Sequence, residues 1–446
     1  MVQLRRALGE DAQLHLVGGT IRDALSGQEV KDLDCATSLV PDEILSRLAK
    51  AGIHVIPTGL QHQTVTAVPV EGEPGVEITT FRGPDMSPAG GVVASESINI
   101  DVQYRDFTIN ALAFDLAREA LIDNVGGVAD LDQKIIRAVG DARTRFSEDP
   151  LRVLRMVRFA CKADFRISPE TLDASAELAD AIPQISVERV RDELSKILVS
   201  DRPKFGLRLL HDLGFLAKIL PEIDSFVGFE QNEYHLYDLF DHTLEVVAKT
   251  PPELLIRLSA LMHDVGKPAT LSIDPESGFR HFFKHETVGA EMCRDILKRL
   301  RYPNRVVDEV CVLTATHMRP IESGPGGLRR LLRDTGDLFP AWRQLKVADA
   351  TSCRLDLEEF HSRLAAFDAA LEEVRRGPQV SPLKSLAVKG DDLLAAGHAA
   401  GPIIGKILRA LHERVLDTPE LNEKETLLAL VPDVVREIEL KDAPAT

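Results

Sequence analysis

The stretch Leu14–Thr37 decides how the first part of this 446-residue chain folds: LHLVGGTIRDALSGQEVKDLDCAT. A short apolar run, Leu14–Val17, predicts a strand that ends at Gly18 and Gly19, and a helical segment, Thr20–Leu25, follows. Glycine lets the backbone approach a phosphate closely, and the first N–H groups of a helix point at a bound anion. This order of elements therefore predicts a phosphate-binding turn.

A pair of aspartates, Asp32 and Asp34, lies on the second short strand of the same stretch. Because side chains alternate along a strand, we expect both carboxylates to point in one direction. Two carboxylates on one face repel each other unless a cation lies between them, and Mg²⁺ is usually bound by one or two carboxylates plus substrate phosphates. The pair indicates phosphoryl or nucleotidyl transfer, and two solvated aspartates on a loop are the alternative.

The order GGTIRD followed by KDLD resembles the signature of the DNA polymerase β-like nucleotidyltransferases. Its particular form resembles the bacterial (class II) CCA-adding tRNA nucleotidyltransferase and poly(A) polymerase family. The resemblance implies that Asp32 and Asp34 are catalytic and hold Mg²⁺, and that Gly18, Gly19 and Arg22 cradle the triphosphate. It also implies tRNA, CTP and ATP as partners.

A second block, Asp101–Ala113, reads DVQYRDFTINALA and resembles the family motif written RRDFTINA, with Tyr104 in place of the first arginine. In the family this segment contacts ribose and triphosphate. The resemblance therefore implies nucleotide binding by Arg105, Asp106 and Asn110. A buried Arg–Asp pair at the start of a helix is the structural alternative.

The segment SEDPLRVLRMVRFACK is expected to form a helix with Ser147 as its N-cap. Asp149 and Arg152, three residues apart, share a helix face and resemble the family's base-reading EDxxR motif. Cytosine and adenine each present an amino donor beside a ring-nitrogen acceptor, which Asp and Arg match, whereas uracil and guanine present the opposite order. Arg155 and Arg158, in the same basic segment, are assigned to nucleotide binding. A surface salt bridge is the alternative.

The remaining apolar runs of residues 1–140 predict a small mixed sheet with helices. Further strands are expected at Val55–Pro57, Val65–Val70, Val76–Phe81 and Ile109–Phe114, and a helix at Pro41–Ala51. Glu77 is either a third carboxylate near the aspartate pair or an edge-strand residue facing water. Gly83–Ile100 is expected to be a mobile loop, and it lacks the Arg-rich piece of the family pattern, which leaves the set of added nucleotides open.

A second constellation holds six of the thirteen histidines, between residues 235 and 317. The context LMHDVGKP resembles the HD superfamily, whose metal ligands are a His, an adjacent His-Asp pair and a distant Asp. The resemblance implies four ligands in this chain: His242, His263, Asp264 and Asp349. His285 and His317 continue the order of histidines outside that set. Such ligands suit Mn²⁺, Ni²⁺ or Zn²⁺ and phosphoester hydrolysis, although HD domains also persist as scaffolds.

Composition limits the class of protein. The net charge of −17 argues against coating nucleic acid by bulk electrostatics, although Arg143–Arg166 carries seven Arg or Lys against three acids. No apolar run is long enough to span a bilayer, no signal peptide is visible, and five scattered cysteines fit reduced thiols in the cytoplasm. The oligomeric state is left open.

The expected fold class is α+β, with a polymerase β-like head followed by helices only. The expected domains are a catalytic head (1–140), a helical neck for base recognition and RNA binding (141–225), an HD domain (226–350) and a helical, tRNA-binding tail (351–446). A helix at Val187–Leu198 is expected to brace the nucleotide-reading helix through Glu188, Arg189 and Glu193.

The expected function is template-independent addition of CCA, or part of it, to the tRNA 3′ end. The alternatives in the same class are a CC-adding enzyme, an A-adding enzyme and a poly(A) polymerase. A metal-dependent HD phosphohydrolase whose front domain senses nucleotides is a rival from another class. A binding module without turnover is disfavoured by the intact aspartate pair.

Overall fold

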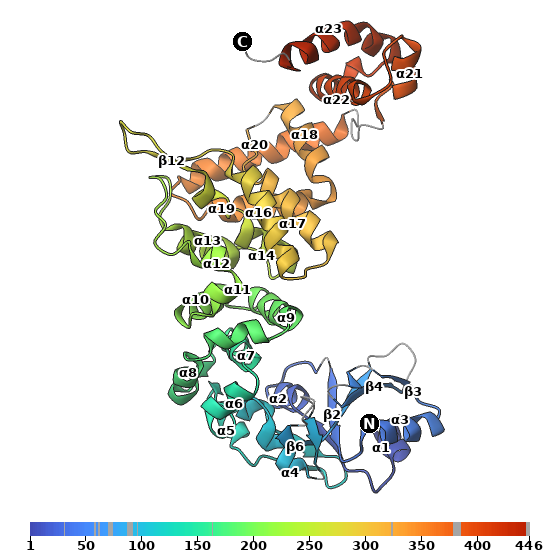
Figure 1. Cartoon of the computed structure of the whole chain (residues 1–446), viewed down its shortest axis with the longest axis vertical. Coiled ribbons are helices and arrows are strands. Elements are labelled where there is room, and N and C mark those ends of the chain that lie inside the picture. The colour runs from blue at the N-terminus through green and yellow to red at the C-terminus, as the bar shows by residue number, and fades with distance from the viewer. Residues whose placement is uncertain are drawn as a thin grey trace. The chain divides into compact units, whose positions relative to one another are not determined.

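The computed structural model describes residues 1–30, 32–57, 59–60, 63–69, 75–86, 92–95, 97–162, 164–322, 324–377 and 385–442. The chain divides into two compact units, Met1–Pro221 and Glu222–Thr446. In Figure 1 the first unit runs from blue to green and the second from green to red. The large sheet belongs to the first unit alone.

The first unit combines this sheet with short helices. Its strands are β1 (Leu14–Val17), β2 (Leu33–Thr37), β3 (His54–Ile56), β4 (Thr64–Val68), β5 (Val76–Thr80), β6 (Arg82–Met86), β7 (Val92–Ala94), β8 (Ala113–Asp115), β9 (Ala120–Ile122), β10 (Ile135–Ile136) and β11 (Arg166–Ile167). Its helices are α1 (Val2–Leu8), α2 (Gly19–Leu25), α3 (Pro41–Lys50), α4 (Ile98–Asp101), α5 (Gly127–Asp132), α6 (Ala142–Glu148), α7 (Leu151–Ala160), α8 (Pro169–Ser175), α9 (Val187–Leu198), α10 (Pro203–Asp212) and α11 (Phe215–Ile219). The short helix α12 (Pro221–Asp224) spans the junction with the second unit.

Seven strands form one mixed sheet in the order β3-β4-β5-β2-β1-β8-β9, in which only β2 and β5 run parallel. One face packs against α1 and α3, where Cys35 of β2 and Ile78 of β5 join Leu8 and Leu48 in a buried apolar cluster. Because side chains alternate along a strand, Asp34 of β2 and Glu77 of β5, the residues next to Cys35 and Ile78, point to the opposite face of the sheet. That face carries the polar residues of the site.

Most of the elements expected in the first unit are confirmed. Leu14–Val17 and Val187–Leu198 have the expected bounds, and α2, α3 and β3 to β5 lie within two residues of theirs, with Val70 outside the described residues. β2 begins at Leu33, so Asp32 directly precedes the strand on which it was expected. The strand expected at Ile109–Phe114 is wrong in its first half. Thr108–Asn110 forms a 3-10 turn instead, and only Ala113–Asp115 pairs with β1 and β9.

The prediction of a loop at Gly83–Ile100 is wrong in part, because two short strands occupy some of this segment. β6 and β7 pair antiparallel with an irregular register, and α4 begins at Ile98. Residues 87–91 and 96 lie outside the described part of the chain. The pairing could not be predicted because this segment is rich in Gly and Pro, which are depleted in strands.

The N-cap expected at Ser147 is also wrong, because Ser147 lies in the last turn of α6. That helix begins earlier, where the side chain of Asp141 accepts from the backbone N–H of Thr144 at 2.8 Å. Pro150 then precedes α7. Since proline has no N–H and disfavours a helical residue before it, the two helices are separated at Asp149 and Pro150.

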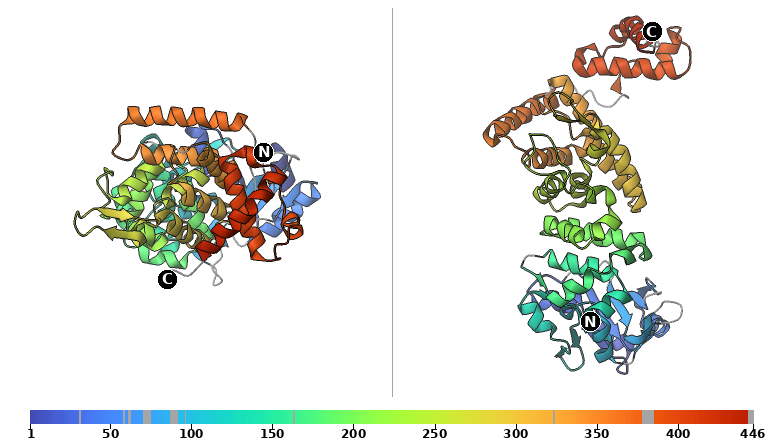
Figure 2. Two further views of the ribbon diagram at one scale, coloured as in Figure 1. Left: turned by 90° about the horizontal axis from the view of Figure 1, so that it is seen from above. Right: turned by 60° about the vertical axis from the view of Figure 1, so that its left-hand side comes forward.

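The second unit is helical in its described residues apart from one small hairpin (Figure 2). Its elements are α13 (Leu239–Lys249), α14 (Leu254–Met262), α15 (Lys267–Thr270), β12 (Leu271–Ile273), β13 (Arg280–Phe282), α16 (His285–Arg299), α17 (Asn304–Thr316), α18 (Pro325–Thr335), α19 (Phe339–Ala350), α20 (Leu357–Arg376), α21 (Gly390–Ala395), α22 (Pro402–Asp417) and α23 (Lys424–Asp442). No described helix combines the length and the apolar composition that a membrane crossing needs.

The last helices form a core of their own around Leu393, Leu411 and Leu427. Helix α22 is joined to α18 by ion pairs, in which Arg330 contacts Glu413 and Asp417, each at 2.6 Å. A helical C-terminal region agrees with the sequence expectation.

Candidate active site

A pocket of about 830 Å³ lies in the first unit where β1 turns into α2. Gly18 precedes α2 with a φ of 64°, a conformation that favours glycine. A Cβ on Gly18 would lie 3.1 Å from Nη1 of Arg105, and one on Gly19 would lie 3.7 Å from Oδ2 of Asp34. The glycine pair thus brings the backbone close to both a guanidinium and a carboxylate.

Among the acidic residues that line this pocket, three lie on or beside the neighbouring strands β2 and β5: Asp32, Asp34 and Glu77. Asp34 and Glu77 are register partners on β2 and β5, and Asp32 directly precedes β2. Thr20 holds this corner, because its hydroxyl donates to the carbonyl oxygen of Asp32 at 3.1 Å and accepts from the N–H of Asp34 at 2.8 Å. The aspartates are thereby fixed to the first turn of α2.

The carboxylates of Asp32, Asp34 and Glu77 bring like charges close together on one side of the pocket. Burial, followed by the charge of Glu77, raises the pKa of Asp34 to about 6. A divalent cation would relieve this repulsion, and oxygen-only ligands suit Mg²⁺. The sequence left Glu77 open between a site neighbour and an edge residue; it lines the pocket from β5, an inner strand of the sheet.

Cationic side chains form much of the remaining wall. The guanidinium groups of Arg22, Arg155 and Arg158 lie 5.1, 6.0 and 4.3 Å from the ring centroid of Phe159. Cation–π contacts of this kind hold the groups together despite their equal charge. The described lining contains seven arginines and one lysine: Arg22, Arg82, Arg105, Arg152, Arg155, Arg158, Arg189 and Lys196. This wall suits a polyanion such as a triphosphate.

A buried network around Asp106 positions two of these arginines. Asp106 accepts from Nε of Arg155 at 2.7 Å and from the amide of Asn110 at 3.1 Å. Burial alone would raise the pKa of Asp106, but Arg155 and Asn110 hold it well below the usual range. Oδ1 of Asn110 in turn accepts from Nη1 of Arg22 at 2.6 Å. The network therefore ties α2 to α7.

Arg105 and Asp106 do not pair with each other, but each takes part in an Arg–Asp pair, the structural alternative that the sequence left open. Arg105 instead contacts Asp101, with Nη2 and Oδ2 2.7 Å apart. Asp101 also accepts from the backbone N–H of Arg82 at 2.9 Å. The side chain of Arg105 is thereby directed to the pocket beside Gly18.

Arg152, expected to read a base edge, lines the pocket from the first turn of α7. Its Nη1 donates to Oε2 of Glu148 and to the carbonyl oxygen of Arg145, both at 2.7 Å. Its Nη2 donates to the carbonyl oxygen of Tyr104 at 3.2 Å. Arg152 is therefore anchored on three sides without a pairing to Asp149.

Asp149 lines the same pocket and is paired from α9, where Nη2 of Arg189 lies 2.6 Å from its Oδ2. A second contact between α9 and α7 joins Glu193 and Arg158 at 2.7 Å. Glu188 lies in the first turn of α9. The bracing expected of this helix corresponds to the contacts of Arg189 and Glu193.

Several lining residues were not predicted from the sequence, among them Thr20, Arg82, Phe159 and Lys196. A signal for Thr20 was available, because a hydroxyl directly after a glycine pair faces the following strand in a turn this tight. Phe159 could not be separated from the apolar stripe of its helix, since its ring is buried. Arg82 belongs to no motif, and Lys196 lies on the helix expected to brace, Val187–Leu198, without an assigned role.

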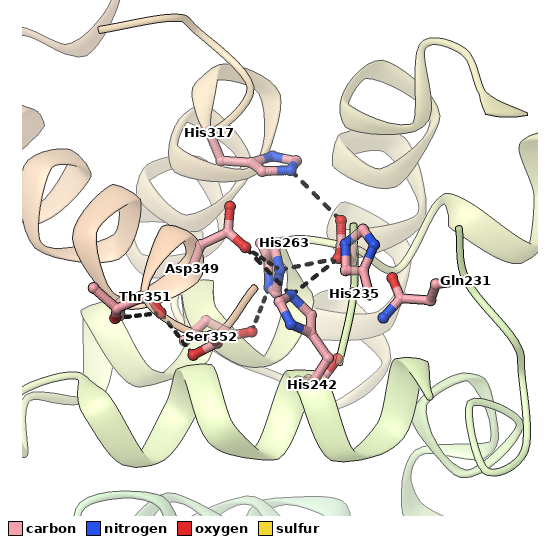
Figure 3. Close-up of polar contacts among 12 residues, drawn as sticks. Gln231, His235, His242, His263, His317, Asp349, Thr351 and Ser352 are labelled. Carbon is pink, nitrogen blue, oxygen red and sulfur yellow. Dashed lines mark hydrogen bonds and ion pairs between the residues drawn. The ribbon is translucent and has the colours of Figure 1, made fainter. Parts of the chain in front are cut away.

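A second cluster of polar side chains lies in the second unit. His242 of α13, His263 at the end of α14 and Asp349 of α19 turn toward one another (Figure 3). Nε2 of His242 is 3.2 Å from Oδ1 of Asp349 and 3.6 Å from Oδ2 of Asp264, and Nε2 of His263 is 3.1 Å from the latter oxygen. Within the described chain neither Nε2 has a hydrogen-bond partner. The four ligands expected from the sequence therefore converge, and their chemistry suits a transition metal.

Comparison with known families covers most of the chain. Residues 14–137 match the Poly A polymerase head domain, residues 164–227 the Probable RNA and SrmB- binding site of polymerase A, and residues 232–353 the HD domain. Families of the first and third kind depend on metals, and the two clusters above supply candidate metal-binding groups.

Relatives match at nearly full length. An A-adding tRNA nucleotidyltransferase of Deinococcus radiodurans is 33% identical over 89% of this chain and 90% of its own. A CC-adding tRNA nucleotidyltransferase of Thermus thermophilus is 33% identical over 89% of this chain and 88% of its own. The solved structure of the Bacillus stearothermophilus CCA-adding enzyme in complex with CTP aligns with a TM-score of 0.71 at 26% identity, over 99% of this chain and 97% of that chain. With head, RNA-binding region and HD domain in one order, this chain belongs to the family of tRNA nucleotidyltransferases and poly(A) polymerases that carry an HD domain.

Proposed function

We propose that this protein adds the CCA sequence to the 3′ end of tRNA from CTP and ATP, without a nucleic-acid template. One observation carries the proposal: the carboxylates of Asp32, Asp34 and Glu77 share a pocket with a wall of arginines. Carboxylate oxygens suit Mg²⁺ and guanidinium groups suit a triphosphate, so the pocket offers both halves of a nucleotidyl-transfer site. A proposed tRNA substrate also fits a cytoplasmic protein with free cysteines.

In this reaction the 3′-hydroxyl oxygen of tRNA bonds to the α-phosphorus of the nucleotide. The bond from that phosphorus to the bridging oxygen breaks, and pyrophosphate leaves with the electron pair. Gly18 and Gly19 allow the backbone to approach the triphosphate, and Arg22 and Arg105 neutralise its charge. Because Asn110 and Asp101 already fix these two arginines, little reorganisation is needed when charge develops.

Asp32 and Asp34, with Glu77 beside them, are the residues that would hold Mg²⁺. When bound, Mg²⁺ supplies activation of the attacking hydroxyl and stabilisation of the leaving pyrophosphate. The donor set supports this assignment, because burial first and then the charges of Glu77 and Asp32 raise the pKa of Asp34, and a cation would offset both effects. Thr20 keeps the aspartates aligned by its two hydrogen bonds.

We assign base selection to Asp149 and Arg152. Glu148 and the carbonyl oxygens of Arg145 and Tyr104 occupy three of the five N–H groups of Arg152, which leaves two for the ring nitrogen of cytosine or adenine. Asp149 accepts from the exocyclic amino group. The remaining residues assigned to nucleotide binding are Arg105, Asp106, Asn110, Arg155 and Arg158, of which Asp106 acts by positioning Arg155 and Asn110.

We assign the HD cluster to a resident transition cation, Mn²⁺, Ni²⁺ or Zn²⁺, held by His242, His263, Asp264 and Asp349. An HD phosphohydrolase with a merely nucleotide-sensing front domain is not favoured. The head and RNA-binding matches precede the HD match, and full-length relatives are named for nucleotide addition to tRNA.

Complete CCA addition is tested with tRNAs that lack CCA, CA or the final A, each incubated with CTP, ATP or both. We expect CTP to extend the first two, ATP to extend the third, and both together to complete every end. The names of the relatives do not decide between complete and partial CCA addition, because an A-adding and a CC-adding enzyme are each 33% identical to this chain. Repeated extension of a generic RNA by ATP alone would instead identify a poly(A) polymerase.

A variant connects this assay to the proposed site. We expect Asp32→Ala to abolish addition while CTP still binds, because the arginines and glycines that hold the triphosphate remain. Retained addition by Asp32→Ala would remove the aspartate pair from the mechanism.

A further inference from the structure

We propose that Cys293 and Cys311 form a reversible disulfide when the protein is exposed to a peroxide. Cys293 lies on α16 and Cys311 on α17, and both thiols are free and buried. The other three cysteines lie elsewhere in the chain: Cys35 on β2, Cys161 at the end of α7 and Cys353 after α19. The inference concerns the second unit alone and is independent of nucleotide addition.

Helices α16 and α17 follow each other in the chain and pack side by side (Figure 1). They approach closely at Gly289 of α16, where an added Cβ would touch Cγ2 of Thr314 on α17 at 3.5 Å. An ion pair joins the same two helices, with Nη1 of Arg294 2.6 Å from Oδ1 of Asp308. Side chains as short as cysteine can therefore meet across this interface.

The two thiols are in direct contact. Sγ of Cys311 donates to the carbonyl oxygen of Ala290 at 3.3 Å, and Ala290 lies about one turn before Cys293 on α16. The side chains of Cys293 and Cys311 also hydrogen-bond to each other. A disulfide requires two cysteine side chains that point toward each other across a short separation, and thiols that share a hydrogen bond are oriented in this way.

The surroundings of the two thiols give them different reactivity. The hydrogen bond with Cys293, followed by the charge of Arg294, lowers the pKa of the Cys311 thiol against the opposing effect of burial. The same hydrogen bond, followed by burial, raises the pKa of Cys293, which therefore keeps its proton. Because the thiolate is the nucleophile in thiol oxidation, Cys311 reacts first and Cys293 follows.

Both steps conserve atoms and electrons. The sulfur of Cys311 attacks one oxygen of hydrogen peroxide and the O–O bond breaks, which leaves a sulfenic acid on Cys311. The departing oxygen takes up the proton that Cys311 released and becomes water. The sulfur of Cys293 then attacks the sulfur of Cys311, the S–O bond breaks, and the hydroxyl leaves with the proton of Cys293 as a second water. Two thiols are oxidised to one disulfide while one peroxide is reduced to two waters.

The disulfide joins two helices that reach the HD cluster, because α16 begins with His285 and His317 directly follows α17. A crosslink between neighbouring helices stabilises them by restricting the unfolded chain. A dithiol reductant reverses the bond, as is usual for disulfides of cytosolic proteins. The pair is thus a redox-sensitive lock on this part of the second unit.

The test exposes the reduced full chain to hydrogen peroxide, removes the peroxide with catalase and unfolds the protein in the presence of N-ethylmaleimide. Peptide mass spectrometry without reduction should find a linked pair of peptides that contain Cys293 and Cys311. The thiols of Cys35, Cys161 and Cys353 should carry the maleimide. Dithiothreitol added before the maleimide should restore all five thiols.

Cys353→Ser is the matched control, because Cys353 is the most exposed of the five cysteines. This variant should still give the linked peptides. Oxidation should raise the melting temperature of the unsubstituted chain by several degrees. Cys311→Ser should remove both the linked peptides and this oxidation-dependent rise, and circular dichroism of the reduced variants checks their fold.

Three results would overturn the proposal. Peroxide could leave all five thiols free or oxidise Cys311 without linking it to Cys293, and either result would exclude the disulfide. Linkage through Cys353 would show that exposure, and not contact between thiols, selects the partner. An unchanged melting temperature in a fully linked chain would exclude the lock on α16 and α17. The linkage itself is read on the unsubstituted chain, so loss of fold in a variant does not affect it.

Discussion

The head pocket and the HD cluster both bring acidic side chains together, but they do so in opposite surroundings. In the head, Asp32, Asp34 and Glu77 line an open pocket of about 830 Å³ with arginines around it. In the HD cluster, Asp264 and Asp349 lie against buried histidine side chains, and Lys267 pairs with the carboxylate of Asp264. The first site is built from oxygen donors alone, and the second mixes oxygen with nitrogen.

This difference in ligands and surroundings indicates which kind of cation each site suits. Mg²⁺ prefers oxygen ligands, keeps water and arrives with phosphates, which an open pocket with a cationic wall permits. Imidazole and carboxylate together suit transition metals. The predictions below test whether the two sites are chemically separate in this way.

The largest effect is expected from Asp34→Asn, which removes a charged oxygen ligand and leaves the fold of β2 intact. We expect nucleotide addition to fall by about a thousand-fold or more, since metal-held charge stabilisation contributes several kcal/mol. Single-turnover addition of one nucleotide to tRNA measures it. The control is Asp42→Asn, an exposed aspartate of α3. The HD metal content should stay the same, and a loss of less than tenfold would contradict the assigned role.

A smaller effect is expected from Asp149→Ala, which removes the acceptor for the base amino group. Discrimination of CTP against UTP should fall by about 5–150-fold, the equivalent of about 1–3 kcal/mol for one base contact. The ratio of kcat/KM for the two nucleotides measures it, with Asp192→Ala, an exposed residue of α9, as the control. If the rate falls while the ratio stays constant, Asp149 acts only by anchoring Arg189.

The residues of the two sites could be predicted from the sequence better than the residues that surround and contact them. Gly18, Gly19, Asp32 and Asp34 were found because chemistry demands fixed spacings within a few residues of one turn. Their surroundings come from distant segments: Glu77 reaches Asp34 only through the parallel pairing of β2 and β5. Strand order is a tertiary property that alternation along a strand does not specify.

The same limit explains the errors at element ends. Ser147 looked like an N-cap because serine, two acids and a proline precede an apolar stripe, but Asp141 begins a separate helix first. In the HD cluster the order of His263, Asp264 and His317 was visible, whereas the contact of Asp264 with His285 depends on the close approach of Gly266 to α16. Local propensity does not resolve such contacts.

A stability effect is expected from Asp106→Asn, because the pKa of Asp106 lies below its usual range in the folded protein. The ionised carboxylate stabilises the fold above the unfolded-state pKa of about 3.9, and this contribution is lost as pH falls below it. The substitution should therefore lower stability by about 1–3 kcal/mol at pH 7 and have a smaller effect near pH 3.

Hydrogen exchange of the α7 amides, at both pH values, measures this local stability in the full chain. Asp132→Asn, an exposed aspartate of α5, is the control. An equal loss at both pH values would show that the charge of Asp106 is not what holds Arg155 and Asn110.

The smallest effect on nucleotide addition is expected from His263→Gln, which removes an imidazole ligand of the HD cluster. Every described residue lining the nucleotide pocket belongs to the first unit, so addition should stay within about twofold while the bound transition metal falls. His361→Gln, an exposed residue of α20, is the control for both measurements. A tenfold loss of addition in a variant that keeps its circular dichroism would mean that the HD cluster contributes to the transfer reaction. The two sites would then form one functional system despite their different ligand chemistry, because a change confined to imidazole donors would have altered chemistry at the carboxylate site.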